Sequence, residues 1–570
     1  PGSSRVSIDT KNVFTEGIGS CNVGGNFGPA LRSAGINNIV VTGKSKVLIY
    51  IFINDEEVEI RNASHLQQKT VPQVEEIIKK DLGNDFQVLC IGPAGENLVG
   101  AACIIVKNAR GCARTGIGAG FGSKNLKAIT VRGTGRIEAA EPERFKNIVS
   151  RCVNTISQKE VNKRMIEGGV YGPGVYELCG SGGYEILEFE TPYRNFSGKL
   201  VPKEKKELLK PEKFLKYKIG KKPCYSCPIN CGLVYRFEDD NGKSIIVNTL
   251  QLNSISNFGA KLDMNDPRDI LKAHKLCNDL GLDEDVTSNV IAWAFECYEK
   301  GVINIKDTNG LELKWGNKDA VFTLIEKIAY RNGFGSILGD GCKKASEKIG
   351  RGSKKYCVHI KGNDLYECLW MSPSWGFGTV VSPRGGTHTR GAIFVETKNM
   401  SGELYMKFFG VPSIDPSTYD NQEKVVVFTE RLTAVLDCLG MCRSPTCIVP
   451  PANLFPEDYA DLLSAATGLN VSSDALLFIG EKVHTLEKCF NVLHTSWIRK
   501  DDFPPRRFIE TPLAGKYLVD IRKWDELLDA YYEHHGWDKK TGWPKKGTLI
   551  NLGLHEIYEK LKKAGKVPSS

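Results

Sequence analysis

The chain has 570 residues, of which 41% are hydrophobic and 25% are charged, and its formal net charge is +9. This length allows several domains, the composition is ordinary for a globular protein, and no apolar run approaches the roughly 18–20 residues of a membrane span. The modest positive charge does not by itself indicate nucleic acid. Eighteen cysteines scattered along so long a chain argue against a small secreted disulfide framework, and they favour a reducing, cytoplasmic location with metal chemistry.

Residues 1–142 are predicted to form a β-rich domain. Apolar and β-branched runs predict strands at five places, and the pattern at 71–82 is that of an amphipathic helix, with Pro72 in the first turn, where proline is tolerated. The predicted strands cover residues 38–42, 47–53, 58–60, 86–91 and 126–131.

Two glycine-rich segments, 17–28 and 110–124, lie between these strands. Glycine lets backbone amides approach a ligand closely, and arginine offers forked donors to phosphate, so Arg5 and Arg114 beside these segments are candidate phosphate ligands. Neither segment ends in GK[ST] or fits GxGxxG, which excludes the P-loop and dinucleotide motifs. A purely structural turn remains the alternative for each segment.

The segment Cys224–Gly232 places three cysteines at i, i+3 and i+7 among proline and glycine. Short loops of this kind bring three thiolates onto one small iron–sulfur cluster, which then needs a fourth sulfur from elsewhere. A zinc knuckle or three buried thiols are the alternatives. The lysine-rich residues 203–222 just before it predict either a solvated helix face or a docking surface for an acidic electron carrier.

Helical patterns dominate the rest of the chain, whereas residues 364–391 are rich in glycine, tryptophan and proline. A long irregular stretch inside a compact protein usually lines a site, so His388 in this stretch is a candidate site residue, with a core histidine as the alternative. Helices are predicted over residues 142–157, 267–281, 287–300, 462–468, 473–488 and 521–534.

Two short motifs at helix ends resemble each other. Asn278-Asp-Leu-Gly281-Leu282-Asp283 and Asp437-Cys-Leu-Gly440-Met441-Cys442 both give a polar residue, then glycine, a large apolar residue, and Asp or Cys. Two such motifs suggest two halves that grip a paired ligand. Capping of helix ends explains Gly-Leu-Asp equally well.

Taken together, these segments resemble the aldehyde ferredoxin oxidoreductase family of tungsten-pterin enzymes over nearly the whole chain. The family normally has a further N-terminal β segment, so we expect this chain to be shortened at its front. The resemblance rests on the Arg5 segment, residues 19–28, 91–97 and 116–128, the cysteine motif, both helix-end motifs, residues 384–390 and Gly536-Trp537.

The resemblance implies an α+β fold in three parts. A β-rich N-terminal base domain (1–142) would carry two pterin dithiolenes, and two mainly helical domains (143–365 and 366–570) would cover it with one pterin motif each. A tungsten or molybdenum ion would be held by the dithiolene sulfurs alone. One [4Fe–4S] cluster would be bound by Cys224, Cys227, Cys231 and Cys442.

The remaining site residues follow from the same resemblance. Asn22 and Thr115 would offer backbone oxygens to a Mg²⁺ ion between the pterin phosphates, and Arg5 and Arg114 would neutralise phosphate or couple the cofactor to the cluster. His388 would hydrogen-bond the carbonyl oxygen of the substrate and help to move a proton. The pterins would be held by Gly24, Gly116, Asn278, Gly281, Leu282, Asp283, Arg390, Asp437, Gly440 and Met441.

The implied reaction is the oxidation of a small aldehyde to a carboxylate, with two electrons passed through the cluster to ferredoxin or a ferredoxin-like subunit. No nucleic-acid or membrane partner is expected, and a homo-oligomer is left open. The sequence departs from the family at two positions: Asn253 stands where aldehyde-oxidising members carry Glu, and Asn278 replaces a usual Asp.

Asn253 allows a reaction other than aldehyde oxidation, because an asparagine cannot take or give a proton at neutral pH. The catalytic candidates are therefore His388 and Asn253, and the first alternative is a low-potential tungsten-pterin reductase that resembles the benzoyl-CoA reductase catalytic subunit. A zinc- or cluster-stabilised binding protein without redox chemistry is the second alternative.

Overall fold

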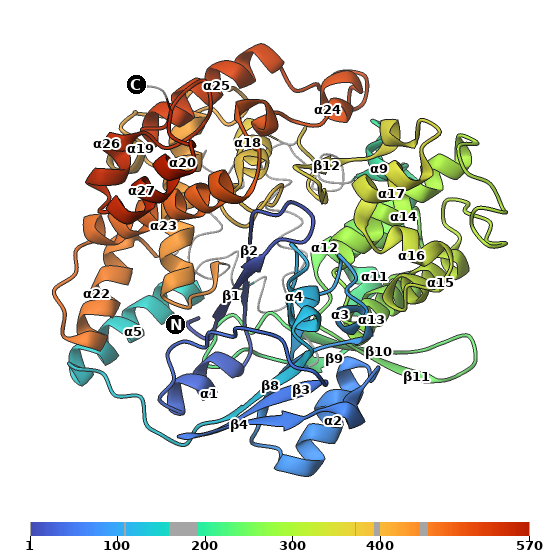
Figure 1. The fold of residues 1–570 in the computed structure, drawn as a ribbon, viewed down its shortest axis with the longest axis horizontal. Helices are drawn as coiled ribbons and strands as arrows, with labels where there is room; N and C mark the ends of the chain where they lie inside the picture. Colours follow the sequence, from blue (N-terminus) through green and yellow to red (C-terminus); the bar gives the residue numbers. More distant parts are fainter. Residues whose placement is uncertain are drawn as a thin grey trace.

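A computed structural model describes residues 2–107, 110–158, 163, 192–370, 372–392, 400–443 and 454–568. Strands dominate the N-terminal part and helices the rest, which confirms the predicted α+β class (Figure 1). Within these residues, no helix combines the length and the apolar character that a membrane crossing requires.

A six-stranded sheet forms the base of the molecule, at the bottom of Figure 1. The neighbours β3 and β8 run parallel, and the other neighbours run antiparallel. Helix α2 (Val71–Leu82) packs on one face of the sheet and α1 (Phe27–Ser33) on the other. The strand order is β4 (Glu57–Asn62), β3 (Ile49–Asn54), β8 (Leu126–Arg132), β5 (Gln87–Ile91), β6 (Ile104–Val106) and β7 (Arg110–Cys112).

One predicted strand is wrong. Residues 38–42 form no strand, and the side chain of Val40 is 84% exposed. Ile39 and Val41 are half-buried against the core that α1 covers, so the apolar run packs as a coil without a hydrogen-bonded neighbour. By contrast, the predicted helix at 71–82 is found at those residues, with Thr70 and Gln73 forming a reciprocal cap at its start.

An antiparallel hairpin of β1 (Val6–Lys11) and β2 (Ile18–Val23) stands in the middle of the molecule, between the two large groups of helices (Figure 1). It packs against α4 (Ile117–Ser123), α20 (Gln422–Cys438) and α23 (Ser473–His494). Residues from the first 25 positions therefore lie beside residues from the last third of the chain.

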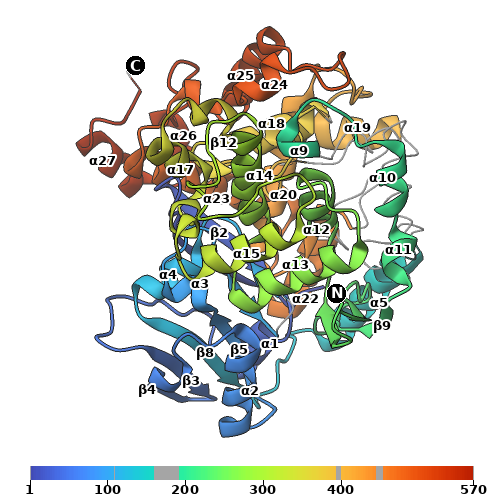
Figure 2. The same cartoon turned by 90° about the vertical axis from the view of Figure 1, so that its right-hand side faces the viewer.

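The first helical group follows a small three-stranded sheet and has its own large apolar core. Its central helix α14 is buried nearly all round, because it packs against helices on several sides (Figure 2). The group contains β9 (Lys218–Lys221), β10 (Leu233–Glu238), β11 (Ser244–Asn248), α13 (Pro267–Leu280), α14 (Glu284–Glu299), α15 (Lys318–Ala329), α16 (Phe334–Leu338) and α17 (Gly341–Ile349).

The second helical group has a core rich in aromatic residues around Trp524 and Trp537. Helix α5 (Pro142–Gln158) belongs to this side of the molecule, because it packs against α22. The domain boundaries at 142 and 365 stay a prediction. The group contains α18 (Pro373–Val381), α19 (Gly402–Phe409), α20, α22 (Pro456–Thr467), α23, α24 (Arg506–Glu510), α25 (Ile521–His534), α26 (Lys546–Asn551) and α27 (His555–Lys563).

Candidate cluster and active site

The three cysteines of the 224–231 loop and Cys442 share one region of the structure. Cys231 interacts electrostatically with Cys224, Cys227 and Cys442, although Cys442 is more than 200 positions away in the sequence. Burial raises the pKa of the Cys231 thiol to about 11. No cysteine in the described part of the chain is held in a disulfide, so disulfide formation does not remove these four thiols as metal ligands. This arrangement brings together the four predicted cluster ligands.

The spacing of these sulfurs bears on the kind of metal group. All four lie in the described residues, and no three of them approach within 4.8 Å of one another. A single zinc ion with bonds near 2.3 Å would need tetrahedral sulfurs about 3.8 Å apart. A four-iron cluster is larger and holds its cysteine sulfurs farther apart. The kind of metal group that these four thiols bind stays a prediction.

Arg5 connects the cysteines to the N-terminal hairpin. Its guanidinium donates to Sγ of Cys442 at 3.0 Å and to both oxygens of Asn22, at 2.8 Å for the carbonyl and 3.0 Å for the side chain. Its backbone N–H donates to the carbonyl of Gly440 at 3.0 Å. Although burial opposes its charge, the nearby thiols raise the pKa of Arg5. Arg5 is thus a fixed cation at the cysteine site, and its role in coupling two cofactors stays a prediction.

Gly24 leaves room beside the cysteine loop. A Cβ atom at this position would lie 2.9 Å from Sγ of Cys224. The chain also approaches closely at Gly440, where φ is +63° and a Cβ would lie 2.9 Å from the carbonyl oxygen of Arg5. Both positions therefore require glycine, and both were predicted from the motifs as cofactor residues.

Asp437 is the centre of a buried charge network behind this region. Its carboxylate accepts from Asn22 at 2.9 Å, from Arg384 at 3.1 Å and from Arg390 at 2.7 Å. Arg390 also pairs with Glu487 on α23. The Nε atoms of Arg384 and Arg390 are buried without a partner, as is Nε of Arg5. Buried guanidinium donors of this kind suit an anionic phosphate tail, and the pterin site itself stays a prediction.

The first helix-end motif, residues 278–283, packs against the N-terminal base domain. Gly281 ends α13 at φ +72°, and a Cβ there would lie 2.7 Å from the backbone nitrogen of Gly92. Leu282 forms a β-bridge with Ala102. The carboxylate of Asp283 caps α14 by accepting from the backbone of Asp285 at 2.8 Å. Asp283 therefore acts as a helix cap, the alternative reading of this motif, and it also accepts the backbone N–H of Arg114.

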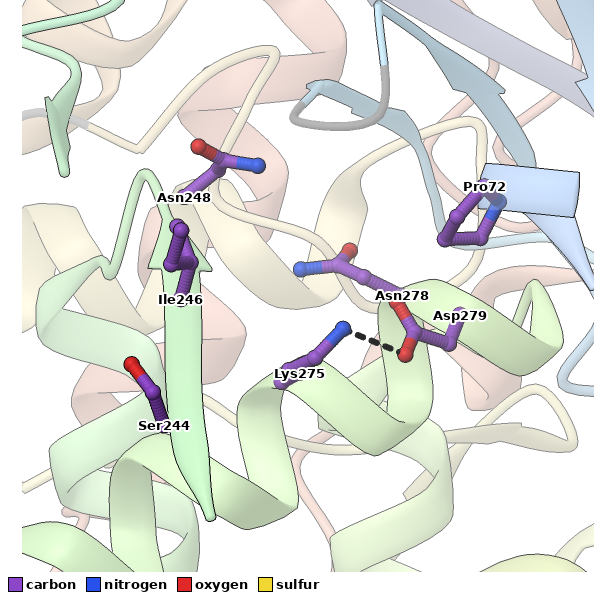
Figure 3. Close-up of a pocket in the computed structure, with 7 residues that line it drawn as sticks. All are labelled: Pro72, Ser244, Ile246, Asn248, Lys275, Asn278 and Asp279. Atoms are coloured by element: carbon purple, nitrogen blue, oxygen red, sulfur yellow. Dashed lines mark hydrogen bonds and ion pairs between the residues drawn. The ribbon is translucent and has the colours of Figure 1, made fainter. Parts of the chain in front are cut away.

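Asn278 is the first residue of this motif, but its side chain faces a different region. Its side chain contacts Nε2 of His274 at 2.9 Å and lines a pocket of ≈ 300 Å³ between α13, β11 and the start of α2 (Figure 3). Neither Asp283 nor His388 lines this pocket. Asn278 thus faces a different space from Asp283, and its role toward a pterin stays a prediction.

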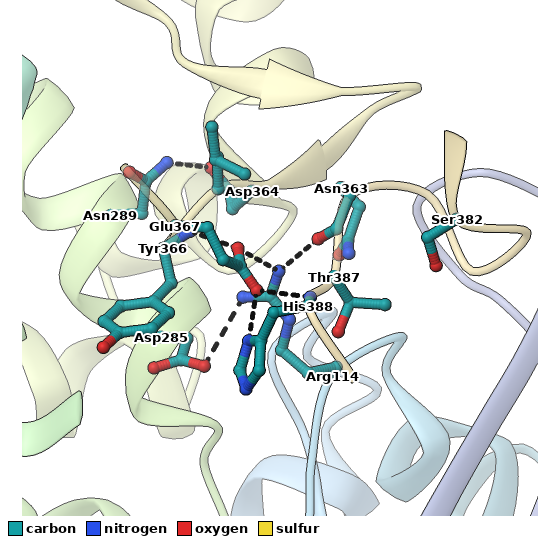
Figure 4. Close-up of polar contacts among 12 residues, drawn as sticks. Arg114, Asp285, Asn289, Asn363, Asp364, Tyr366, Glu367, Ser382, Thr387 and His388 are labelled. Atoms are coloured by element: carbon teal, nitrogen blue, oxygen red, sulfur yellow. Dashed lines mark hydrogen bonds and ion pairs between the residues drawn. The ribbon is translucent and has the colours of Figure 1, made fainter. Parts of the chain in front are cut away.

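His388 is held by a buried carboxylate (Figure 4). Its Nδ1 lies 2.7 Å from Oε1 of Glu367, and its backbone N–H donates to the same oxygen at 2.9 Å. The ring lies against Trp375, with centroids 5.3 Å apart. Glu367 is fully buried; burial opposes its charge, but Arg114 and His388 lower the pKa of its carboxyl to about 2. The imidazole is thus oriented by a permanent anion, with Nε2 turned away from it.

Arg114 joins this pair to the first helical group. Its guanidinium donates to the carbonyl of Gly386, lies 3.4 Å from Glu367 and pairs with Asp285 at 3.6 Å. Its Nε is buried without a partner, as is the hydroxyl of Thr115. Thr115 and Gly116 adopt left-handed backbone at φ +61° and +72° and start α4. The glycine-rich segment therefore places Arg114 at the site, as expected.

The two carbonyl oxygens predicted for Mg²⁺ already take part in hydrogen bonds. The oxygen of Asn22 accepts from Arg5 at 2.8 Å, and that of Thr115 accepts from the backbone N–H of Val13 at 3.2 Å. A carbonyl oxygen has a second lone pair for an ion. The magnesium site stays a prediction.

Asp285 is a site residue that the sequence did not single out. Its carboxylate accepts from Asn257 at 2.6 Å and lies 3.3 Å from Nδ2 of Asn253. Burial raises the pKa of this carboxyl, and Arg114 opposes that shift. The position where the family carries Glu is therefore next to another carboxyl group.

Glu367 was also missed, as was Lys261 at the end of the π-helix Ile255–Lys261. Lys261 is fully buried, donates to the carbonyl of Leu365 at 3.4 Å, and burial lowers its pKa to about 8. Glu367 lies in the irregular stretch 364–391, so its position in the sequence was a usable signal. Lys261 had none, because a single lysine among apolar residues does not reveal that it is buried.

Comparison with known proteins places this geometry in a family. A family model described as aldehyde ferredoxin oxidoreductase, N-terminal domain, matches residues 1–133, and one described as aldehyde ferredoxin oxidoreductase, domains 2 and 3, matches residues 181–554. The chain belongs to the aldehyde ferredoxin oxidoreductase family. It is an oxidoreductase of this type.

Individual relatives agree with this assignment. The tungsten-containing aldehyde ferredoxin oxidoreductase of Pyrococcus furiosus is 34% identical, over 98% of this chain and 88% of the relative. The WOR-like subunit of an aliphatic sulfonate oxidoreductase from the same organism is 27% identical, over 99% of this chain and 87% of the relative. The structure of the active site complex BamBC of benzoyl coenzyme A reductase, with 1,5-dienoyl-CoA, covers 100% of this chain and 89% of that chain, at a TM-score of 0.84 and 26% identity.

Proposed function

We propose that this chain oxidises an aldehyde to a carboxylate with a tungsten-pterin cofactor and passes two electrons through one [4Fe–4S] cluster to ferredoxin or a ferredoxin-like subunit. Family membership supports the reaction class, since four relatives between 32% and 34% identical are named tungsten-containing aldehyde ferredoxin oxidoreductases. When bound, the pterin-held metal would supply two-electron chemistry, and the cluster would carry the electrons singly.

The residues at the site fit these groups. Four interacting thiols from two distant segments suit an iron–sulfur cluster. The buried cations Arg5, Arg384 and Arg390, each with an unpartnered Nε, suit phosphate tails. Arg5 contacts Cys442 and Asn22 at once, so it would lie between the cluster and the pterin.

The observation that carries the proposal is the His388–Glu367 pair. Because Nδ1 of His388 is engaged with a carboxylate, Nε2 is the ring atom that can face a substrate. A protonated Nε2 would donate to the carbonyl oxygen of an aldehyde, and the neutral ring would accept a proton when the product forms. Trp375 and Tyr366 border the ring and would keep water from one side of the substrate.

The direct test is aldehyde-dependent reduction of a viologen dye by anaerobically purified protein. His388→Ala should lower turnover by roughly 10²–10⁴-fold, the usual contribution of a positioned acid–base group, and leave the tungsten content unchanged. His494→Ala, which removes an exposed histidine at the end of α23, is the matched control and should keep parental activity. Parental turnover in His388→Ala would show that this role is wrong.

A second candidate function is a low-potential reductase acting on an aromatic acyl-CoA. It is favoured by Asn253, which cannot exchange a proton, and by the likeness to the benzoyl coenzyme A reductase complex. Benzoyl-CoA-dependent oxidation of a reduced viologen, without any response to aldehydes, would support it. Asp285, 3.3 Å from Asn253, favours the aldehyde reaction because it restores a carboxyl group at this position.

A further inference from the structure

A second cluster of possible metal ligands lies in the C-terminal helical group, apart from the cysteine site. It consists of Glu430 on α20, His484 on α23 and His535 at the end of α25, and each is at most 2% exposed. One ligand atom from each lies within 4.8 Å of the other two, and this is the one such group within the described residues. Three helices therefore point one nitrogen or oxygen donor each at a common buried point.

The distances in this group are those of metal ligands. Oε2 of Glu430 lies 3.2 Å from Nε2 of His535 and 3.4 Å from Nε2 of His484. The hydroxyl of Tyr531 lies 3.1 Å from the same oxygen and 3.3 Å from Nε2 of His484. Four donors bonded to one zinc ion at 2.0–2.1 Å would be about 3.3–3.4 Å apart in a tetrahedron.

These distances are long for direct hydrogen bonds to a carboxylate. Charge-assisted bonds are about 2.7–2.9 Å from nitrogen and about 2.5–2.7 Å from a hydroxyl. The other nitrogen of His535, Nδ1, makes such a short contact, 2.8 Å to Oε1 of Glu481. The same imidazole therefore has a short contact at Nδ1 and a longer one of 3.2 Å at Nε2, and the longer one is close to the separation of two ligands on one zinc ion.

The surroundings orient these ligands as in known metal sites. The contact from Nδ1 of His535 to Glu481 is the second hydrogen bond that metal-bound histidines commonly make to a carboxylate, and it leaves Nε2 for the metal. Both imidazoles lie nearly parallel to the indole of Trp537, at 10° and 20°, which fixes their rings. Gly480 lets α23 approach α20, because a Cβ there would lie 2.2 Å from the carbonyl of Arg431.

We propose that Glu430, His484 and His535 bind one structural zinc ion, with the hydroxyl of Tyr531 at the fourth position. Two imidazoles and a carboxylate are a donor set that suits zinc, and a closed, fully buried site is typical of a structural role. The ion would bind α20, α23 and α25 together. Helix α20 leads to Asp437 and Cys442, and α23 carries Glu487, so the ion would support the charge network of the cofactor site from behind.

The test on the parental protein is anomalous scattering from crystals of the holoenzyme, with data from both sides of the zinc absorption edge. A peak that appears only above the edge, between the four donor atoms, would support the proposal. No peak at this point, in a crystal whose iron and tungsten peaks are strong, would overturn it and leave an imidazolium of His535 between two carboxylates. An ion without the zinc edge would overturn the assignment to zinc.

Variants give an independent readout in solution. His484→Gln should lower the zinc content from about one ion per chain to near zero, because it removes one of the four protein ligands. His494→Gln makes the same change on the same helix at an exposed position and should keep the zinc. Glu481→Gln should weaken zinc retention against a chelator by about 10–100-fold. Unchanged zinc in well-folded His484→Gln, judged by its iron and tungsten content, would contradict the proposal.

Discussion

Oε1 of Glu367 accepts two hydrogen bonds from His388, one from Nδ1 at 2.7 Å and one from the backbone N–H at 2.9 Å. One buried carboxylate therefore fixes both the imidazole and the loop that carries it. Arg114 reaches the other oxygen at 3.4 Å and connects the loop to the glycine-rich segment of the base domain. Two parts of the chain that are 253 positions apart therefore meet at this carboxylate.

Replacing this carboxylate with a neutral amide should impair turnover. Glu367→Gln keeps the shape but removes the carboxylate that orients the imidazole of His388, so we expect aldehyde-dependent turnover to fall on the order of 10²-fold. Glu423→Gln on α20 is the control, because Glu423 pairs with His534 outside the site. Equal turnover in both variants would contradict the role of Glu367.

The same residue should contribute to acid stability. The pKa of Glu367 is about 2 in the folded protein against an ordinary 4.5, so the folded state gains from its ionisation above pH 4.5. This contribution is lost as the pH falls from about 4.5 toward 2, because the folded state then binds a proton less readily than the unfolded state. Midpoints of urea unfolding should therefore fall less steeply with acid in Glu367→Gln. If the urea midpoints of the parental protein and of Glu367→Gln changed equally with pH, this prediction would be refuted.

One matched pair of variants distinguishes a cysteine that binds the cluster from a nearby cysteine that does not. Cys442→Ser should lower the iron content and abolish electron transfer to the dye, since a serine oxygen replaces a thiolate of the cluster. Cys438→Ser, four positions earlier on an exposed side chain, should retain the iron. Iron analysis and the visible absorption of the cluster provide the measurement. Full iron content in Cys442→Ser would exclude this cysteine as a ligand.

Gly281 offers a test of the close contact between α13 and the base domain. Gly281→Ala forces alanine into left-handed backbone and places its Cβ 2.7 Å from the nitrogen of Gly92. Gly301→Ala has nearly the same φ, +70° against +72°, but nothing within 4 Å. The strain alone costs about 1–2 kcal/mol, and overpacking should add roughly 1–3 kcal/mol in Gly281→Ala. Equal thermal midpoints for the two variants would show that the structure relaxes around the added Cβ at position 281 without a further loss of stability.

The sequence was informative where a pattern is local. Helices α2 and α25 are found at the predicted residues, because amphipathic period and capping residues act over a few positions. The strand at 38–42 failed because a β-strand needs a neighbour that the local sequence does not contain. Half-buried Ile39 and Val41 gave the apolar signal, but the exposed Val40 makes no ladder.

The site shows the same limit. The cysteine motif, Arg5 and His388 could be predicted from motifs and from the resemblance. The structure places Arg5 beside Cys442, whereas the partner of His388, Glu367, was not predicted. Asp285 and Glu367 acquire their roles only from tertiary contacts with Arg114 and His388, over separations of up to 253 positions. No spacing rule reports such contacts. The carboxylate of Asp437 contacts Asn22, Arg384 and Arg390, and its role toward a pterin stays a prediction.

The most direct test of the account is the metal content of anaerobically purified protein. The proposed function predicts about one tungsten or molybdenum and about four irons per chain, in the ratio of one bis-pterin site to one [4Fe–4S] cluster. Protein that contains zinc alone, with neither iron nor tungsten nor molybdenum after expression in their presence, would contradict it.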